Sequence, residues 1–298
     1  MVIPSVHSAR SNRVRPAYEP PSALNDLHIL DVLELSESQD RAAAALHVNQ
    51  STVSRSLQLM RREYQLTPGK RQQVCRHGHN ACVQYLRLAY REHRLMAGLL
   101  RIGSDVLHNT LLHGMAGVLQ VPPRFRSAEQ WVELVRHGLL DGAIVSSFSL
   151  ARPLPAGEEP AWEGVAVLPL GSIGLQLVAQ DPHTQQVLLP RRAVLPLLHK
   201  LMEAHAFGVE QQPAACQEPA AWLKRSRDRG LALPVVRELV GRQWLKRNRL
   251  ESLAQQPCLM ERLWLLLPQG AVEASAAQSC WRRLRKKVVQ SEIMQKMH

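Results

Sequence analysis

A short run of polar residues has the chemistry to recognise DNA bases. Residues 49–55 read Asn-Gln-Ser-Thr-Val-Ser-Arg. A glutamine can form two hydrogen bonds with adenine, and an arginine can pair with guanine or with a phosphate. Such side chains face the base edges when they open a helix that enters the major groove. We therefore predict DNA contacts from the polar members of this run: Asn49, Gln50, Ser51, Thr52, Ser54 and Arg55.

Basic residues follow the same run. Between residues 55 and 76 the chain has six arginines and lysines and one acid, Glu63. Charged stretches are most often solvated surface, but phosphate contacts supply much of the affinity of DNA-binding proteins. We therefore add Ser38, Arg61, Lys70 and Arg71 to the predicted DNA-contacting residues.

Four serines are candidates for a second site. Ser104, Ser146, Ser147 and Ser172 each follow an expected strand or a strand break. Polar residues at the ends of parallel strands bind ligands in many α/β proteins. Each hydroxyl could bind a polar group of a small-molecule effector, and each could equally cap the next helix, which is the commoner role.

A cluster of cysteines and histidines offers the ligand types that zinc prefers. Cys75, His77, His79 and Cys82 lie within eight residues. Structural zinc sites usually combine two such clusters across a longer loop, and this sequence has no second cluster. We expect no metal and no cofactor.

The sequence lacks the common catalytic signatures. It contains no Gly-x-Gly-x-x-Gly, Gly-x-x-x-x-Gly-Lys, His-Glu-x-x-His or Gly-x-Ser-x-Gly motif. We therefore expect that the protein is not an enzyme. One alternative stays open, because a nucleophile at Ser146 or Ser147 is conceivable. In that case an α/β enzyme acting on an acidic or nucleotide substrate would carry a helical interaction module.

Three helices would position the DNA-contacting run. Apolar residues between Leu27 and Leu33 have helical spacing, and Ser36 with Gln39 has capping-box spacing for a second, alanine-rich helix that ends at Leu46. After a break at His47-Val48, a third helix runs from Asn49, its predicted N-cap, to about Tyr64.

The second and third helices have the spacing of a helix-turn-helix. Two helices that cross steeply need a small residue where they touch, and Ala43 meets that demand. We expect Leu46, Val48, Val53 and Leu57 to fill the space between them. Apolar spacing alone would also fit two ordinary amphipathic helices, but the polar opening and the basic surroundings favour DNA binding.

A further helix is expected from about Asn80 to Gly98. Val83, Leu86, Tyr90 and Ala97 lie on roughly one face of it. Such a stripe needs a partner, and a second copy of the chain is the simplest one. We therefore predict a homodimer or homotetramer.

Short apolar runs alternate with helical stretches beyond residue 100. This alternation of expected strands and helices predicts an α/β domain with a mostly parallel sheet covered on both faces. The expected strands are Leu100–Gly103, Gly142–Val145, Val165–Leu168, Leu175–Ala179, Val187–Leu189, Leu231–Leu233 and Leu263–Leu267.

The bulk composition fits a DNA-binding protein. The 298 residues carry a net charge of +12, and a field of that size attracts polyanions. No apolar run is long enough to span a membrane. Residues 1–21 have no apolar core typical of a secretory signal. With five cysteines, an odd number, we expect reduced thiols and a cytoplasmic location.

The motif resembles that of the LysR-type transcriptional regulators. The matching residues are Ser38, Ala42-Ala43, Leu46 and the run from Val48 to Arg55. Weaker similarities follow in the same order: residues 100–103 resemble the first strand of that family's effector domain, residues 138–144 its Gly-x-Leu-Asp-x-Ala-Ile element, and residues 230–234 its glycine-rich region. Residues 124–126 resemble a shortened second strand, and the segment after Met60 departs from the family's wing.

The resemblance implies a fold and a function. The expected fold class is α/β overall, with an all-α winged helix-turn-helix, a linker helix and an effector domain of two subdomains similar to periplasmic binding proteins. The expected divisions are a flexible arm (1–23), a DNA-binding domain (24–78), a linker helix (79–98) and an effector domain (99–298), whose second subdomain covers about 169–264. The implied partners are double-stranded DNA and an unknown small-molecule effector, with no membrane. A regulator that has lost its effector and acts constitutively remains an alternative.

Overall fold

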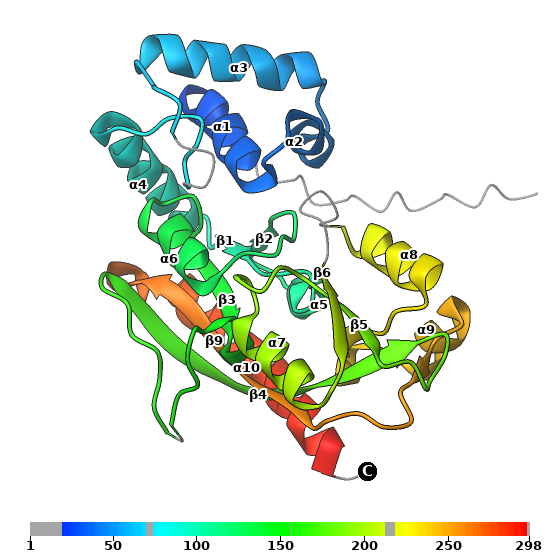
Figure 1. Cartoon of the computed structure of the whole chain (residues 1–298). Coiled ribbons are helices and arrows are strands. Elements are labelled where there is room, and N and C mark those ends of the chain that lie inside the picture. Colours follow the sequence, from blue (N-terminus) through cyan, green and yellow to red (C-terminus); the bar gives the residue numbers. More distant parts are fainter. Residues whose placement is uncertain (1–19, 70–73, 156, 212–217, 297–298) are drawn as a thin grey trace, which may run out of the picture.

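The N-terminal part of the chain is a small helical domain. The computed structural model describes residues 20–69, 74–155, 157–211 and 218–296. Leu30 and Leu33 of one helix pack against Val53 and Leu57 of another to form the domain's core. Figure 1 shows these helices together at one end of the molecule, with a longer helix leading away from them. The elements are η1 (Ser22–Leu24), α1 (Asn25–Ser36), α2 (Gln39–Leu46), α3 (Gln50–Glu63) and the longer helix α4 (Ala81–Met96).

The rest of the chain is an α/β domain. One seven-stranded sheet has the order β2-β1-β3-β9-β4-β7, with β8 also pairing with β4, and β5 and β6 form a second, two-stranded sheet. The strands are β1 (Leu100–Gly103), β2 (Val118–Gln120), β3 (Gly142–Ser146), β4 (Val165–Ala179), β5 (Gln186–Leu189), β6 (Gly208–Gln211), β7 (Leu233–Val236), β8 (Glu251–Ser252) and β9 (Leu259–Pro268). The helices are α5 (Asn109–Leu112), α6 (Ala128–Arg136), η2 (Ser147–Ser149), α7 (Pro196–Ala204), α8 (Pro219–Arg229), η3 (Arg237–Leu239), α9 (Arg242–Asn248), η4 (Gln269–Ala271) and α10 (Ser275–Lys296). The predicted fold class is confirmed: a helical domain, a linker helix and an α/β domain.

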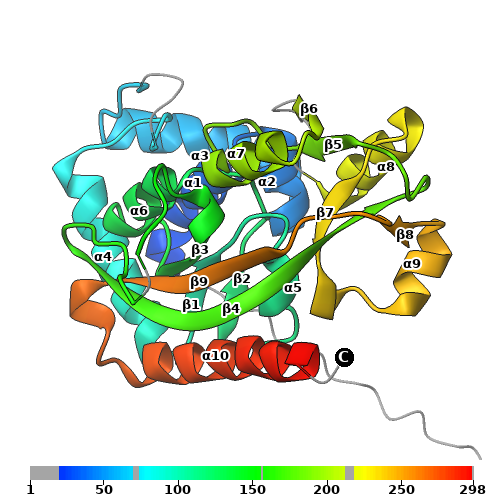
Figure 2. The same ribbon diagram turned by 60° about the horizontal axis from the view of Figure 1, so that its bottom comes forward.

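The sheet is mixed, so the expectation of a mostly parallel sheet is wrong. β1 pairs in parallel with β2 and β3, but β9 is antiparallel to both β3 and β4. The two runs expected as separate strands at residues 165–168 and 175–179 are one long strand, β4. It pairs with β9 from Val165 opposite Pro268 to Leu175 opposite Leu259, with a register shift between Pro169 and Gly171. Figure 2 shows β4 and β9 running across the whole α/β domain, so they join its two halves.

Helices cover both faces of this sheet. α10 lies along one face, and α6 and α7 lie on the other (Figure 2). Ala277, Cys280, Leu284 and Val288 of α10 are buried, at the spacing of one helix face. The buried apolar core continues from one half of the domain into the other, and the rings of Phe125 and Trp222 meet edge to face at 5.0 Å.

Residues 124–126 do not form the short strand that the sequence suggested. The second strand is Val118–Gln120 instead. Both guanidinium groups turn toward the end of α1, where Arg124 donates to the carbonyl of Ser36 (2.8 Å) and Arg126 to that of Leu35 (2.7 Å). Because these two groups satisfy carbonyls that a helix end leaves unpaired, this segment joins the two domains rather than extending the sheet.

Three further expectations concern the whole chain. The arm expected at residues 1–23 lies almost entirely outside the described residues. Among the described helices, none is long and apolar enough to span a membrane. The cysteines that the structure describes, Cys75, Cys82, Cys258 and Cys280, are free.

Candidate DNA-binding interface

The tight turn between α2 and α3 builds the helix pair as the sequence predicted. His47 adopts a left-handed conformation (φ 54°), and the Val48 amide donates to the carbonyl of Ala43 at 3.0 Å. Ala43, Val53 and Leu57 are buried where the helices meet. Leu46 is only half-buried, and Val48 is exposed, so the placement of Val48 between the helices is wrong. The turn itself exposes it.

The beginning of α2 differs from the capping-box prediction. Ser36 is the buried last residue of α1, which ends because Glu37 is left-handed (φ 55°). Ser38 occupies the N-cap position of α2 with an extended backbone and makes no capping hydrogen bond through its side chain. Asn49 holds the N-cap position of α3 in the same way, also without a side-chain bond.

The first two turns of α3 present their polar side chains outward. Asn49, Gln50, Ser51 and Arg55 are exposed, and Thr52 and Ser54 are half-buried. These six side chains therefore line the outer side of the helix pair, on the helix farthest from the α/β domain in Figure 1.

Two hydrogen bonds organise this face. The side-chain nitrogen of Gln50 donates to the side-chain oxygen of Gln39, and the guanidinium of Arg55 donates to the Ser51 hydroxyl at 3.4 Å. Gln50 keeps one N–H and its carbonyl oxygen free to form the donor–acceptor pair that adenine requires. On the inner side of α3, the Ser56 hydroxyl donates to Asp26 at 2.6 Å, which fixes α3 against α1.

The basic residues after α3 have mixed roles. Arg61 is half-buried, and Arg62 is exposed but forms an ion pair with Glu63 at 2.8 Å. Arg76 donates to the carbonyl of Glu37. Lys70 and Arg71 lie outside the described residues. In the described part of residues 64–80 there is no strand, and the Gly69 amide donates to the carbonyl of Arg76 at 2.9 Å. The two described ends of the expected wing are therefore held together, and its residues 70–73 lie outside the described residues.

α4 is packed against its own chain. Val83 and Tyr90, which the sequence placed on a stripe facing a second copy, are fully buried against the helical domain. Leu86 packs partly against the same core and Ala97 is exposed, so most of that stripe is covered within the chain and does not need a second copy. The side chains that α4 leaves exposed are Ala81, Cys82, Tyr85, Ala89, Glu92 and Met96.

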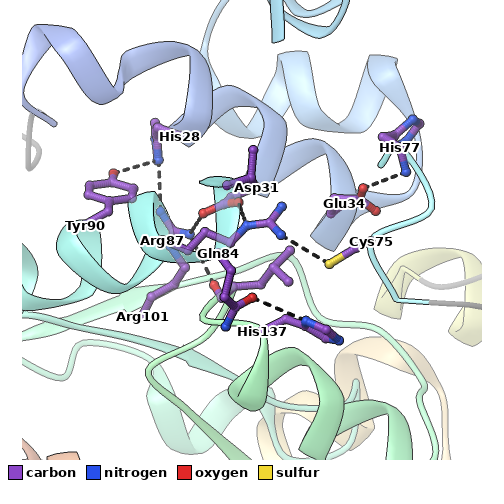
Figure 3. A network of polar contacts seen from close by, with 12 residues as sticks. His28, Asp31, Glu34, Cys75, His77, Gln84, Arg87, Tyr90, Arg101 and His137 are labelled. Atoms are coloured by element: carbon purple, nitrogen blue, oxygen red, sulfur yellow. Dashed lines mark hydrogen bonds and ion pairs between the residues drawn. The ribbon is translucent and has the colours of Figure 1, made fainter. Parts of the chain in front are cut away.

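Buried ion pairs join α1, α4 and the α/β domain. Asp31 of α1 accepts from Arg87 of α4 (2.8 Å) and from Arg101 of β1 (3.0 Å), and these side chains are almost completely buried (Figure 3). Asp141 accepts two bonds from Arg94 (2.7 and 2.5 Å) and one from the Arg101 amide. Two carboxylates thus position the helical domain on the α/β domain.

A neutral histidine completes this network. Tyr90 donates to Nδ1 of His28 at 3.0 Å, and Arg101 approaches the same nitrogen at 3.1 Å (Figure 3). Burial, assisted by the charge of Arg101, lowers the pKa of His28 to about 4. The ring is therefore uncharged near neutral pH, and Tyr90 and Arg101 share the single lone pair of Nδ1.

Sequence reasoning missed this network, although a signal was present. Arg87, Arg91 and Arg94 recur on the same helix face as Val83 and Tyr90, and all five side chains are buried. Arginines at core positions of an apolar stripe need buried partners. Their carboxylate partners are 47 to 56 residues distant in sequence, so spacing could not identify them.

Three of the candidate effector serines, Ser104, Ser146 and Ser147, lie at or directly after the end of a strand, whereas Ser172 lies within β4; all four have intramolecular partners. Ser146 accepts from the Phe148 amide at 3.2 Å and Ser147 from the Arg262 amide at 3.0 Å. Ser172 lies opposite Arg262 in the ladder, so the structure brings these three together at β9. Ser104 is separate from them and donates to the carbonyl of Asp105 at 3.3 Å. The bond that Ser146 accepts from Phe148 is a cap of the short helix η2, so for this serine the capping alternative holds.

A buried histidine lies close to Ser104. His108 is fully buried, with one ring nitrogen 2.8 Å from Asp105 and the other 2.7 Å from Glu261 of β9. Burial alone would lower the pKa of His108, but the two carboxylates raise it well above its usual value. An imidazolium therefore links β9 to the loop that follows β1.

The comparisons with known proteins give likeness at the level of structure. No protein-family model matches the sequence, and no curated protein does. ArgP from Mycobacterium tuberculosis is 17% identical, with 88% of this chain and 96% of that chain covered and a TM-score of 0.48. CbnR, described as a LysR family transcriptional regulator, is 11% identical over 88% and 98%, with a TM-score of 0.46.

A third solved structure has a ligand. LysG from Corynebacterium glutamicum with bound effector Arg is 13% identical, covering 89% of this chain and 98% of that chain, with a TM-score of 0.42. The solved structures that this chain resembles over most of its length are those of LysR-family transcriptional regulators, the family that residues 38–55 resemble in sequence.

Proposed function

We propose that this chain is a transcription regulator of the LysR type that binds duplex DNA through α2 and α3. The observation that carries the proposal is the outward face of α3. Its first turns expose Gln50, Ser51 and Arg55, while Val53 and Leu57 on the other side anchor the helix in the core. A firmly held helix with an exposed polar N-terminal end matches the geometry of major-groove recognition.

Binding to defined DNA tests this proposal. We would measure fluorescence anisotropy with the duplex upstream of the protein's own gene or of a neighbouring gene, and with a random duplex of equal length. We expect tighter binding to the former and a steep loss of affinity with salt. Equal affinity for both duplexes would refute sequence-specific recognition.

Two substitutions separate base contacts from phosphate contacts. Arg55→Gln is expected to weaken binding, and if Arg55 contacts a phosphate the salt slope falls by about one. Gln50→Ala is expected to relax the preference at one base pair, at a cost of about 1–3 kcal/mol on the preferred site. Arg247→Gln is the matched control, because Arg247 is an exposed arginine of α9, which lies far from α3 in Figure 1.

We propose that the regulator is a homo-oligomer formed through the outer face of α4. Cys82, Tyr85, Ala89, Glu92 and Met96 recur at the three- and four-residue steps of a helix–helix seam, and Tyr85 and Met96 are 71% and 86% exposed. Light scattering should show a dimer or a tetramer. Tyr85→Asp should reduce the assembly state, and an unchanged mass would exclude this face as the interface.

We propose that the α/β domain responds to a small molecule held where β4 and β9 join its halves. Ser146 and Ser147 use their oxygen atoms to accept backbone bonds, so each hydroxyl hydrogen remains available to donate to a ligand. Calorimetry against a panel of metabolites tests this. The absence of any binding heat would favour the constitutive alternative, which the apolar core shared by the two halves also fits.

A further inference from the structure

We propose that Cys75, His79 and His137 form a binding site for a divalent zinc-like metal ion, at the junction of the helical domain and the α/β domain. The ligand atoms of these three residues lie within 4.8 Å of one another. The sequence cluster contributed Cys75 and His79. The third ligand comes from the end of α6, more than fifty residues later.

The local backbone places Cys75 and His79 side by side. Cys75 adopts a left-handed conformation (φ 63°), and its carbonyl accepts from the Gly78 amide at 3.1 Å, which makes a tight turn between the two ligands. Gly78 is itself at φ 125°, and a Cβ there would lie 2.5 Å from Leu66. Asn80 then fixes the chain, because its side chain accepts from Val83 (3.0 Å) and donates to the Tyr64 carbonyl (2.6 Å).

The orientation of His137 suits metal binding. Gln84 of α4 donates through its amide nitrogen to the carbonyl of Arg136 (3.1 Å), which directs its oxygen toward Nδ1 of His137 at 3.4 Å (Figure 3). A proton on Nδ1 then donates to Gln84 and leaves the lone pair of Nε2 for a metal. Buried partners of this kind commonly set the tautomer of histidine ligands.

The set of donors selects the class of metal. One thiolate and two imidazoles form a set that zinc and similar transition metals prefer, whereas calcium and magnesium prefer oxygen. In a tetrahedral zinc site such ligand atoms lie about 3.4–3.6 Å apart, so a small inward movement of the exposed His79 side chain would complete the geometry. Glu133 lines the same cavity of ≈ 520 Å³ and its Oε2 lies 3.4 Å from Nε2 of His137, but its carboxylate is outside the group of mutually close ligand atoms and would have to rotate to become a fourth ligand.

A cation lies against the thiol, but the thiol is protonated. Arg87 donates to the sulfur of Cys75 at 3.2 Å, whereas burial raises the pKa of this thiol to about 12, so a metal would have to displace its proton. The guanidinium is itself paired with Asp31, which it shares with Arg101, so its charge is only partly compensated. The commoner interpretation of such a group is a polar crevice with two histidine rings in edge contact, as His79 and His137 are at 4.5 Å. The convergence of a buried thiol with both rings favours the metal.

A metal here would connect two parts of the chain. Cys75 and His79 lie in the loop between α3 and α4, whereas His137 caps α6. The ion would therefore hold the helical domain in one position on the α/β domain. If the proposed function is correct, metal loading also changes DNA affinity, and this consequence rests on that proposal.

Cobalt titration of the whole purified chain tests the site directly. The protein is reduced, stripped with a chelator and titrated with Co²⁺ without oxygen. We expect one equivalent per chain, the intense visible bands of tetrahedral cobalt, a sulfur-to-cobalt charge-transfer band, and displacement by Zn²⁺. The absence of those bands in the wild-type protein would overturn the proposal.

Substitutions identify the ligands. His137→Gln and His79→Gln are expected to weaken Co²⁺ binding at least about 100-fold, and Gln84→Ala roughly 10-fold. The matched controls are His77→Gln and Cys82→Ser, which belong to the same sequence cluster but not to the site. Wild-type spectra and affinity in His137→Gln would overturn the proposal. Metal-free thermal unfolding of each variant shows that the fold is retained, since His79 is exposed and the amide introduced by His137→Gln can keep the bond to Gln84.

A DNA-binding measurement separates the metal-site proposal from the proposed function. Anisotropy with and without one equivalent of Zn²⁺ should differ for the wild-type protein and not for His137→Gln. A protein that binds cobalt tetrahedrally but binds no DNA retains the metal site and loses the proposed function. A protein that binds DNA but no cobalt gives the reverse result.

Discussion

Replacing Asp31 by asparagine is expected to destabilise the protein strongly. Asp31 is fully buried and is the carboxylate partner of Arg87 and Arg101, which are almost as deeply buried. The substitution preserves shape and one acceptor oxygen, but two guanidinium groups would then face a neutral amide. Removing one partner from a buried ion pair costs about 3–5 kcal/mol.

The magnitude of the effect follows from the retained acceptor and the chain length. Because asparagine can still accept one bond, we take the lower value, about 3 kcal/mol. With an unfolding entropy of about 2.1 cal/mol/K per residue, this loss over 298 residues corresponds to a fall in Tm of roughly 5 °C. If the helical domain unfolds separately, its own transition shifts further, and calorimetry would show two transitions.

The control and the refuting result are both specific. Asp40→Asn makes the same chemical change at an exposed carboxylate of α2, and it should cost less than about 1 kcal/mol. Asp31→Asn combined with Arg87→Gln should cost less than the sum of the two single changes, because they share one interaction. A Tm within 1 °C of wild type for Asp31→Asn (roughly 0.6 kcal/mol on the same entropy scale), or strict additivity, would refute the role given to this pair.

Three further predictions concern buried groups. Burial raises the pKa of Glu34 from 4.5 to about 7, so the folded state holds a proton that the unfolded chain loses, and stability falls as pH rises from about 5 to 7. Glu34→Gln can keep the bond from the His77 amide. The Tm of this variant relative to wild type should rise across that pH range, and the underlying difference in unfolding free energy should reach at most about 3 kcal/mol. The raised pKa of His108 acts on the alkaline side: its stabilisation is complete below about pH 6.5 and is lost as pH rises through the raised value, so His108→Gln should show a flatter Tm profile there. Finally, a Cβ at Gly142 would lie 2.8 Å from the Leu266 carbonyl, so Gly142→Ala should lower the free energy of unfolding by about 1–3 kcal/mol, measured with denaturant. A Cβ at Gly270 would meet open space, so Gly270→Ala should be neutral. Equal effects of the two substitutions would contradict the close packing of β3 on β9.

Local patterns in the sequence determined the helical domain. The spacing of Ala43, Val53 and Leu57 required two crossing helices, and most of the polar residues between them in sequence face outward, with Ser56 the buried exception. Strand positions such as 100–103 and 142–145 also followed from short apolar runs. These features depend on contacts between residues close in sequence, which periodicity records.

Tertiary structure decided everything that depends on distant partners. Periodicity could not show that residues 165–179 form one strand antiparallel to β9, because strand direction depends on which strands become neighbours. It assigned the stripe on α4 to a second copy, whereas the helical core buries Val83 and Tyr90 of that stripe, and Asp31 and Asp141 pair with the arginines beside it. The same limit applied to Cys75 and His79: their third neighbour, His137, comes close only because α6 packs beside the loop between α3 and α4.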